Sequence, residues 1–324
     1  MKIYFAPLEG VSGYVFRNAH HAYFPGVDRY YAPFISTSSN GFHKRKEVRD
    51  ILPEHNKGIP LVPQLLSNHA GDFIHYAKQI RALGYEEVNL NLGCPSKTVV
   101  TKKKGSGFLK DPETLAGFLD EVFSGLDMEV SVKTRIGLED PEEWEALLSV
   151  YNQFPVKELI VHPRTQKDYY KHPVRMEAFA FAMEQSRHPI CYNGDICTKQ
   201  DYERICQQFP NLSAVMIGRG FLKNPALVRE LTGGAGLDVT TLRAYHDRLY
   251  KDYRELFFGD KPVLFKMKEF WMYLLEGHPR LSSCWKKIKK TQRLAEYDGI
   301  VYEVFDKLGS FLEEAPDKTD FVER

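Results

Sequence analysis

A single cysteine follows a strand-like run and precedes a lysine-rich loop. The segment "EEVNLNLGCPSKTVVTKKKGSGFLKDPE" (86–113) alternates Val88, Leu90 and Leu92, stops at a glycine and continues with Cys94. A free thiol has a pKa of about 8.5, so at neutral pH it is mostly protonated and can act as an acid. A cation beside the sulfur would favour the thiolate instead. The acid-free loop after the cysteine contains Lys97, Lys102, Lys103 and Lys104.

Polar, cationic and small residues also follow the other apolar runs of the first 220 residues. They are Pro7, Leu8, Glu9, Gln64, Asn91, Lys133, Arg135, His162, Arg164, Asn193, Gly194, Asp195, Gly218 and Arg219. Taken singly, each has a structural explanation, such as a rim lysine, a hydrogen-bonded histidine or an Asn–Gly turn. Their recurrence at successive run ends favours a site. The glycines and the arginine of the last two ends are suited to holding a phosphate through backbone N–H groups and charge.

The elements that must position these residues alternate regularly. Eight apolar runs cover 2–7, 29–34, 60–66, 87–93, 129–135, 158–164, 189–195 and 214–220. Segments with helical spacing lie between them, and the one at 111–126 begins with an N-cap aspartate followed by proline. This order predicts an α/β fold, a (β/α)8 TIM barrel with its site at the carboxyl ends of the strands. A doubly wound sheet is the alternative, but "APLEGVSG" stands where its glycine-rich turn should follow the first strand.

The pattern changes near residue 238. From there to the end of the sequence only helical periodicity is present, with aromatic and charged residues. We therefore expect a barrel domain at 1–237 and a smaller all-helical domain at 238–324.

Composition limits the class of protein. The chain has 324 residues, 43% hydrophobic residues and a formal net charge of +1, so any basic surface must be local. Its five cysteines form no CxxC pair and have no ligand-like spacing, which indicates reduced thiols and no metal site. The start "MKIYFAPLEG" lacks the apolar segment of a signal peptide, and no run approaches a membrane span. We expect a cytoplasmic protein, without a membrane partner, that is monomeric.

Seven motifs carry a family resemblance. "APLEGV", "NLNLGCPS", "GSGFLKDPE", "SVKTRIG", "VHPRT", "YNGDI" and "VMIGRG" stand in the order and spacing of flavin-dependent tRNA dihydrouridine synthases. The sequence resembles this family across roughly residues 1–235, most specifically in the GCPS motif. Within the family, "APLEGV" and "GCPSKTV" are most similar to the bacterial C-type enzymes.

The resemblance implies an activity and a set of roles. The activity is reduction of the C5–C6 double bond of a uridine in the tRNA D-loop, with FMN as hydride carrier and NADPH or NADH as reductant. Cys94 would give the proton to C5. The residues implied to hold FMN are Pro7, Leu8, Glu9, Gln64, Lys133, His162, Asn193, Gly194, Asp195, Gly218 and Arg219. Asn91 and Arg164 are candidates for the uracil. The family's glycine between the histidine and the arginine is Pro163 here, so this position has no backbone N–H to donate.

Two basic segments are candidates for contact with RNA. One is the loop after Cys94, and the other is "KKIKK" in the predicted helical domain. The candidate lysines are Lys97, Lys102, Lys103 and Lys104 in the first, and Lys286, Lys287, Lys289 and Lys290 in the second. Tyr169, past the sixth run, is placed to meet a flipped base.

Two other functions remain open from the residues. One is a different barrel enzyme, a lyase that uses Lys133 as a Schiff-base nucleophile. The other is a barrel that binds RNA without catalysis. Flavin absorbance of the purified protein would reject the first and weaken the second.

Overall fold

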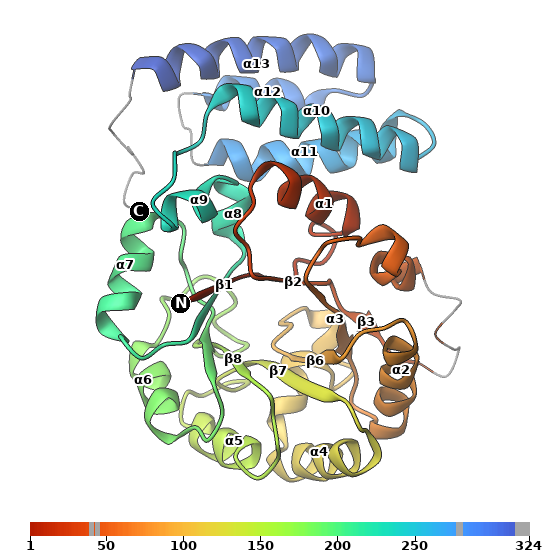
Figure 1. Cartoon of the computed structure of the whole chain (residues 1–324), viewed down its shortest axis with the longest axis vertical. Coiled ribbons are helices and arrows are strands. Elements are labelled where there is room, and N and C mark those ends of the chain that lie inside the picture. The colour runs from red at the N-terminus through yellow and green to blue at the C-terminus, as the bar shows by residue number, and fades with distance from the viewer. Residues whose placement is uncertain (39–41, 43–45, 277–280, 315–324) are drawn as a thin grey trace. The chain divides into compact units, whose positions relative to one another are not determined.

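Ten parallel strand segments form one sheet in the computed structural model, which describes residues 1–38, 42, 46–276 and 281–314 (Figure 1). The strands are β1 (Lys2–Phe5), β2 (Arg29–Tyr31), β3 (Ile35–Ser36), β4 (Leu61–Val62), β5 (Gln64–Leu66), β6 (Glu87–Leu92), β7 (Glu129–Arg135), β8 (Leu159–His162), β9 (Ile190–Tyr192) and β10 (Ala214–Ile217).

The sheet closes into a barrel of eight. Its order is β3-β5-β6-β7-β8-β9-β10-β1-β2-β4, and β2 pairs with β4 while β3 pairs with β5. β4 and β5 are one strand interrupted at Pro63, which has no N–H to donate, and β2 continues into β3 after three residues. Because β4 and β3 stand at opposite ends of the order, these two continuous strands bring the ends of the sheet side by side. All eight predicted runs are strands, and the predicted TIM barrel is confirmed.

The helices are α1 (Tyr14–Tyr23), α2 (Ala70–Ala82), α3 (Lys97–Val100), α4 (Pro112–Gly125), α5 (Glu143–Tyr151), α6 (Met176–Gln185), α7 (Lys199–Gln208), α8 (Arg219–Lys223), α9 (Leu227–Leu231), α10 (Val239–Leu256), α11 (Asp260–Glu276), α12 (Ser282–Lys290) and α13 (Leu294–Glu314). Short 3-10 turns are η2 (Lys46–Ile51), η3 (Pro53–His55) and η4 (Gly105–Lys110). Figure 1 shows α2, α4, α5 and α6 on the outside of the strands.

Local sequence explains where the barrel helices begin and end. The carboxylate of Asp111 accepts a hydrogen bond from the Thr114 N–H, with Pro112 at the first position of α4, as predicted. Gly84 follows α2 with a φ of +95°, a conformation that favours glycine. These caps fix the lengths of the helices between strands.

The described chain divides into two compact units. One comprises 1–10, 28–195 and 206–217 and holds every strand; the other comprises 11–27, 196–205 and 218–324. The second unit thus includes segments that precede residue 238, and the domain boundary at residue 237 stays a prediction.

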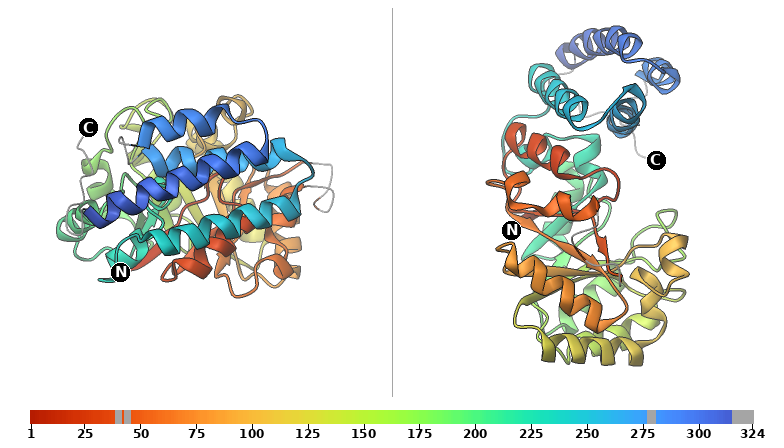
Figure 2. Two further views of the ribbon diagram at one scale, coloured as in Figure 1. Left: turned by 90° about the horizontal axis from the view of Figure 1, so that it is seen from above. Right: turned by 90° about the vertical axis from the view of Figure 1, so that its right-hand side faces the viewer.

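Four helices, α10 to α13, form a bundle in the second unit (Figure 2). At its centre the Tyr297 hydroxyl accepts a hydrogen bond from the Trp271 indole N–H at 2.7 Å and lies 2.7 Å from His246 Nε2. These three buried side chains come from α13, α11 and α10. The network satisfies the Trp271 N–H, the Tyr297 hydroxyl and His246 Nε2, and the predicted helical character of this region is confirmed.

Candidate active site

Asn91, on β6, holds the turn that carries Cys94. The Oδ1 atom of Asn91 accepts hydrogen bonds from the backbone N–H groups of Gly93 at 3.1 Å and Cys94 at 2.9 Å. The Cys94 carbonyl in turn accepts from the Ser106 N–H at 3.2 Å and from its hydroxyl at 2.8 Å. The thiol therefore stands on a backbone that is fixed on both sides.

Glycine is required where the segment after the basic loop returns to this turn. Gly105 has a φ of +56°, and a Cβ on it would lie 2.9 Å from the Cys94 carbonyl oxygen. A Cβ on Gly107 would lie 2.6 Å from the Val100 carbonyl oxygen. The glycines of "GSG" thus permit backbone approach to the cysteine and to α3.

The surroundings of the Cys94 thiol keep it protonated. Burial is the largest effect on its pKa and raises it, and the Glu9 carboxylate raises it further. The backbone of Ser96 and the cations Arg135 and Lys133 lower it, but the net shift is upward. At neutral pH the group is an acid, as the sequence predicted for a thiol not governed by nearby cations.

Arg135 binds together the loops around the thiol. Its guanidinium donates to the Gly93 carbonyl at 3.0 Å, the Thr165 carbonyl at 2.7 Å and the Tyr169 carbonyl at 3.0 Å. The side chain is buried and lies over the Tyr170 ring, 5.4 Å from its centroid. The sequence placed Arg135 among the polar residues at the strand ends but indicated no specific role for it. Its spacing of two from Lys133 on β7 places both side chains on one face of the strand.

Lys133 is the cation of the site that lacks a partner. It lies opposite Asn91 in the β6–β7 register, and its ammonium makes no hydrogen bond or ion pair with any described residue. Burial and the charge of Arg135 lower its pKa from 10.5 to about 8. Such an ammonium fits the polar or anionic edge of a ligand.

Gln64 and Arg164 are largely occupied by protein partners. Gln64 is buried on β5; its Nε2 donates to Asn89 at 2.7 Å and its Oε1 accepts from Asn91 at 2.8 Å. Arg164 donates through Nε to the His172 carbonyl at 2.6 Å and pairs with Asp195. One N–H of its Nη2 is left for a ligand, so its role toward uracil stays a prediction.

The Arg164–Asp195 pair joins the segments that follow β8 and β9. His162 Nε2 is 3.2 Å from Arg164 Nη1, and the Asn193 amide donates to the Met216 carbonyl at 2.8 Å. Gly194 has no space for a side chain, because a Cβ there would meet the Tyr192 hydroxyl at 2.3 Å. Pro163, which replaces the family glycine, accepts the Arg175 N–H through its carbonyl at 2.8 Å.

The remaining predicted cofactor residues fall in two places. Pro7 and Leu8 follow β1 and are partly exposed, and Glu9 is exposed yet close enough to act on the Cys94 thiol. Gly218 and Arg219, the N-cap and first residue of α8, belong to the second unit. Their part in phosphate binding stays a prediction.

The predicted RNA-contact residues are mostly at the surface. Lys97, Lys102 and Lys103 are exposed, whereas Lys104 donates to the Thr37 carbonyl at 2.8 Å. Tyr169 is 40% exposed, with a φ of +47°.

On α12, Lys287 pairs with Glu303 of α13. Among the residues that the structure describes, no ion-pair partner exists for Lys286, Lys289 and Lys290. These three exposed charges remain available to an anionic partner.

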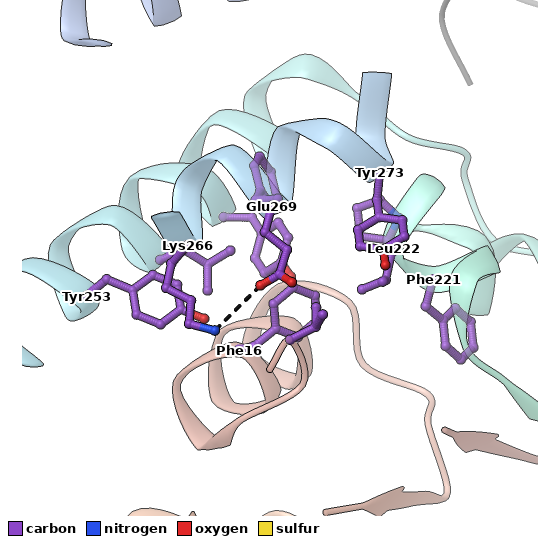
Figure 3. A pocket seen from close by; sticks show the side chains of 12 residues that line it. Phe16, Phe221, Leu222, Tyr253, Lys266, Glu269 and Tyr273 are labelled. Carbon is purple, nitrogen blue, oxygen red and sulfur yellow. Dashed lines mark hydrogen bonds and ion pairs between the residues drawn. The ribbon is translucent and has the colours of Figure 1, made fainter. Parts of the chain in front are cut away.

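A small cavity lies within the second unit, and none of the predicted site residues lines it (Figure 3). It is lined by aromatic side chains such as Phe16 and Tyr273, and Lys266 pairs with Glu269 at 3.5 Å beside it. Its volume is about 10 Å³, close to that of one water position. This is a packing space rather than a ligand site.

Two structural features are absent from the described ranges. No group of three or more His, Cys, Asp or Glu side chains there could hold a metal ion. None of the described helices is long and apolar enough to cross a membrane.

A half-buried thiol on a fixed turn and an unpaired ammonium at the strand ends of a barrel are the features expected of an enzyme active site. The family model "Dihydrouridine synthase (Dus)" matches residues 4–241, and the chain belongs to this family. The predicted family is thus confirmed, and with it the class of flavin-dependent oxidoreductases.

Individual relatives of this chain carry the name of the same family. The chain is 29% identical over 304 residues to a probable tRNA-dihydrouridine synthase of Staphylococcus epidermidis, over 90% of each chain. It is 30% identical over 238 residues to the tRNA-dihydrouridine(16) synthase of Pseudomonas syringae, over 71% of this chain and 74% of that one. A solved old yellow enzyme homologue from Zymomonas mobilis matches with a TM-score of 0.53 and 12% identity, over 74% of this chain and 91% of that one. At that identity the last match supports the barrel fold alone.

Proposed function

We propose that this protein reduces the C5–C6 double bond of a uridine in tRNA, using FMN as the bound carrier and NADPH or NADH as the reductant. The observation that carries the proposal is the Cys94 thiol, which burial keeps protonated while hydrogen bonds fix its backbone. Reduction of the double bond needs a proton at C5, and this thiol is the acid that the site offers.

The barrel mouth suits a flavin. The unpartnered ammonium of Lys133 would hold the polar edge of the ring, where a cation favours the reduced, anionic form. The other residues of the strand-bearing unit that would hold FMN are Pro7, Leu8, Glu9, Gln64, His162, Asn193, Gly194 and Asp195. When bound, the flavin supplies hydride to C6 of uracil.

Proton transfer leaves Cys94 as a thiolate, and the protein stabilises that charge. The Ser96 backbone and the cations Arg135 and Lys133 all lower the thiol pKa, although burial outweighs them while the thiol is neutral. Cys94 can therefore give its proton to C5 without a second protein acid and then regain a proton from solvent.

RNA binding would use the lysines that have no acidic partner. Each phosphate contact made by Lys286, Lys289 or Lys290 should release counterions and give salt-dependent affinity. The Pseudomonas syringae relative is named for position 16, so uridine 16 is the first position to test.

Single-turnover kinetics on Cys94→Ala test the proposal. The variant should bind FMN and tRNA and be reduced by NADPH at the wild-type rate, because none of those steps uses the thiol. Oxidation of the reduced enzyme by tRNA should slow by roughly 10²–10⁴-fold. The matched control is Cys206→Ala, which removes a partly exposed free thiol on α7 and should leave both half-reactions unchanged.

Two results would count against the proposal. Dihydrouridine formed at the wild-type rate by Cys94→Ala would mean that another group gives the proton. A colourless wild-type protein that borohydride traps on a carbonyl substrate through Lys133 would favour the Schiff-base lyase instead.

A further inference from the structure

The inward face of β6 is polar, where a barrel interior is usually filled by layers of Val, Ile and Leu. Glu87, Asn89 and Asn91 share one face of the strand, and Val88, Leu90 and Leu92 share the other. The Glu87 face points into the barrel, since Glu87 acts on the buried Tyr31 hydroxyl together with Glu158, just before β8, and Cys191 of β9. All six side chains of β6 are buried.

These side chains form a hydrogen-bonded row that ends at the cysteine turn. Beginning at the turn, Asn91 donates to Gln64 at 2.8 Å, and Gln64 donates to Asn89 at 2.7 Å. Asn89 then donates to the Ser131 hydroxyl at 2.9 Å, and Ser131 donates to Glu87 at 2.7 Å. The row therefore crosses β5, β6 and β7 and joins the Cys94 backbone to a buried carboxylate.

Both ends of the row fix its direction. The Gly93 and Cys94 N–H groups can only donate, so the oxygen of the Asn91 amide must face them. The Glu87 carboxylate can only accept, so the Ser131 hydroxyl must donate to it. Each amide between them has one orientation that satisfies both neighbours.

The carboxylate end of the row is paired with two cations. Arg29 lies 3.2 Å and Lys157 2.8 Å from the Glu87 carboxylate. Since a charged acceptor strengthens the bonds that lead to it, the row is polarised along its whole length.

This direction decides what the two amides nearest the mouth can offer a ligand. The Asn91 oxygen is used by two backbone N–H groups, and one of its amide hydrogens is used by Gln64, so a single N–H donor remains. Gln64 keeps one N–H and one lone pair. Asn91 can therefore meet a carbonyl oxygen of a pyrimidine ring but not its N3–H.

We propose that Glu87, Ser131 and Asn89 are positioning residues for the site: through the row they hold the Cys94 turn in place and make Asn91 a donor toward ligand carbonyl oxygens. The chemical class of ligand is a pyrimidine-2,4-dione ring, whether of flavin or of uracil. The role toward such a ligand rests on the proposed function, whereas the effect on the Cys94 turn does not.

Ser131→Ala interrupts the row without touching a residue assigned to the cofactor or the RNA. The turn loses its fixed support, and the half-buried thiol gains solvent, so its pKa should fall. Its alkylation by iodoacetamide at pH 7 should speed up by about tenfold. Peptide mass spectrometry separates Cys94 from the other thiols. In the FMN-loaded enzyme, oxidation by tRNA should slow by about tenfold while reduction by NADPH keeps its rate.

The matched control is Thr134→Val on the same strand. Thr134 is equally buried, and its hydroxyl bonds to the Arg135 carbonyl and Tyr151 outside the row. The control loses a buried hydroxyl at comparable cost in stability but should leave the Cys94 alkylation profile unchanged. A Ser131→Ala profile identical to that of Thr134→Val overturns the proposal.

Asn89→Asp gives a readout that a mere packing role would not produce. Burial beside the Glu87 carboxylate should raise the pKa of the new carboxyl and keep it protonated at pH 6. The protonated carboxyl can still donate to Ser131, but the ionised carboxylate cannot, so the row breaks as pH rises. Cys94 alkylation relative to wild type should be normal at pH 6 and should rise above it at higher pH. A ratio independent of pH overturns the proposal. The failure of wild-type enzyme to reduce tRNA would refute the proposed function alone, because alkylation does not depend on turnover.

Discussion

The electrostatics of the site can be tested by measuring the free energy of unfolding of Lys133 variants, because the Lys133 ammonium is largely buried without a partner. Its pKa falls from 10.5 to about 8, with burial as the first cause and the charge of Arg135 as the second. Since one pKa unit corresponds to about 1.4 kcal/mol, keeping the lysine charged costs the folded protein about 3 kcal/mol. The side chain keeps some contact with solvent, so this is an upper bound. Lys133→Met should stabilise the flavin-free protein by about 1–3 kcal/mol at pH 7.

The sign of the pH dependence follows from the two states. Below pH 8 the lysine is protonated in both the folded and the unfolded chain, and the cost is complete. Between pH 8 and about 10.4 the folded lysine loses its proton while the unfolded one keeps it, so wild-type stability rises with pH. The advantage of Lys133→Met should therefore shrink over that range.

Urea unfolding of the flavin-free variant and wild type at pH 7 and pH 9.5 measures this difference. Lys78→Met is the control, since Lys78 is an exposed residue of α2, and it should change stability by less than about 0.5 kcal/mol at either pH. The same Lys133→Met variant should retain FMN poorly, because the cation at the ring edge is lost. A variant that is less stable than wild type, or a difference that does not change with pH, would refute the assigned burial and charge of Lys133.

Two further outcomes are expected. The triple variant Lys286→Gln, Lys289→Gln and Lys290→Gln should weaken tRNA binding. It should also reduce the slope of log affinity against log salt concentration by up to about two to three. The control Lys287→Gln, which removes a lysine already paired with Glu303, should change that slope little. An unaltered slope in the triple variant would assign α12 to a solvated face. Arg135→Lys keeps the charge, but a lysine cannot donate to the three carbonyls that the guanidinium reaches. Oxidation of the reduced enzyme by tRNA should therefore slow by about tenfold or more in rapid-mixing experiments. A wild-type rate would exclude a role for the guanidinium group.

The barrel itself was predictable from sequence because its signals are local. Every apolar run became a strand, and the start of α4 was fixed by Asp111 and Pro112, whose effects need no tertiary contact. The Cys94 turn was likewise visible, because a glycine and a lone cysteine close an alternating run.

The contacts between strand ends were not predictable, since they join residues far apart in sequence. Arg135 meets Thr165 and Tyr169 across about thirty residues, and nothing in "SVKTRIG" shows which carbonyls it reaches. The alternation of Glu87, Asn89 and Asn91 with apolar residues predicts a strand with a solvated polar face. In the closed barrel that face is the interior, so periodicity gave the strand correctly but not the environment of its polar side.

The polar row also bears on how the barrel chooses among strand alignments. A slip of β6 by one residue would turn Val88, Leu90 and Leu92 inward and drive the carboxylate and both amides against the surrounding helices, where nothing would bond them. A slip by two would keep the faces but separate Asn89 from Ser131, its partner in the present register. Each buried polar group left without a partner costs about 1–3 kcal/mol, so competing registers are penalised several times over. An interior of aliphatic side chains would discriminate far less, because apolar contacts tolerate sliding.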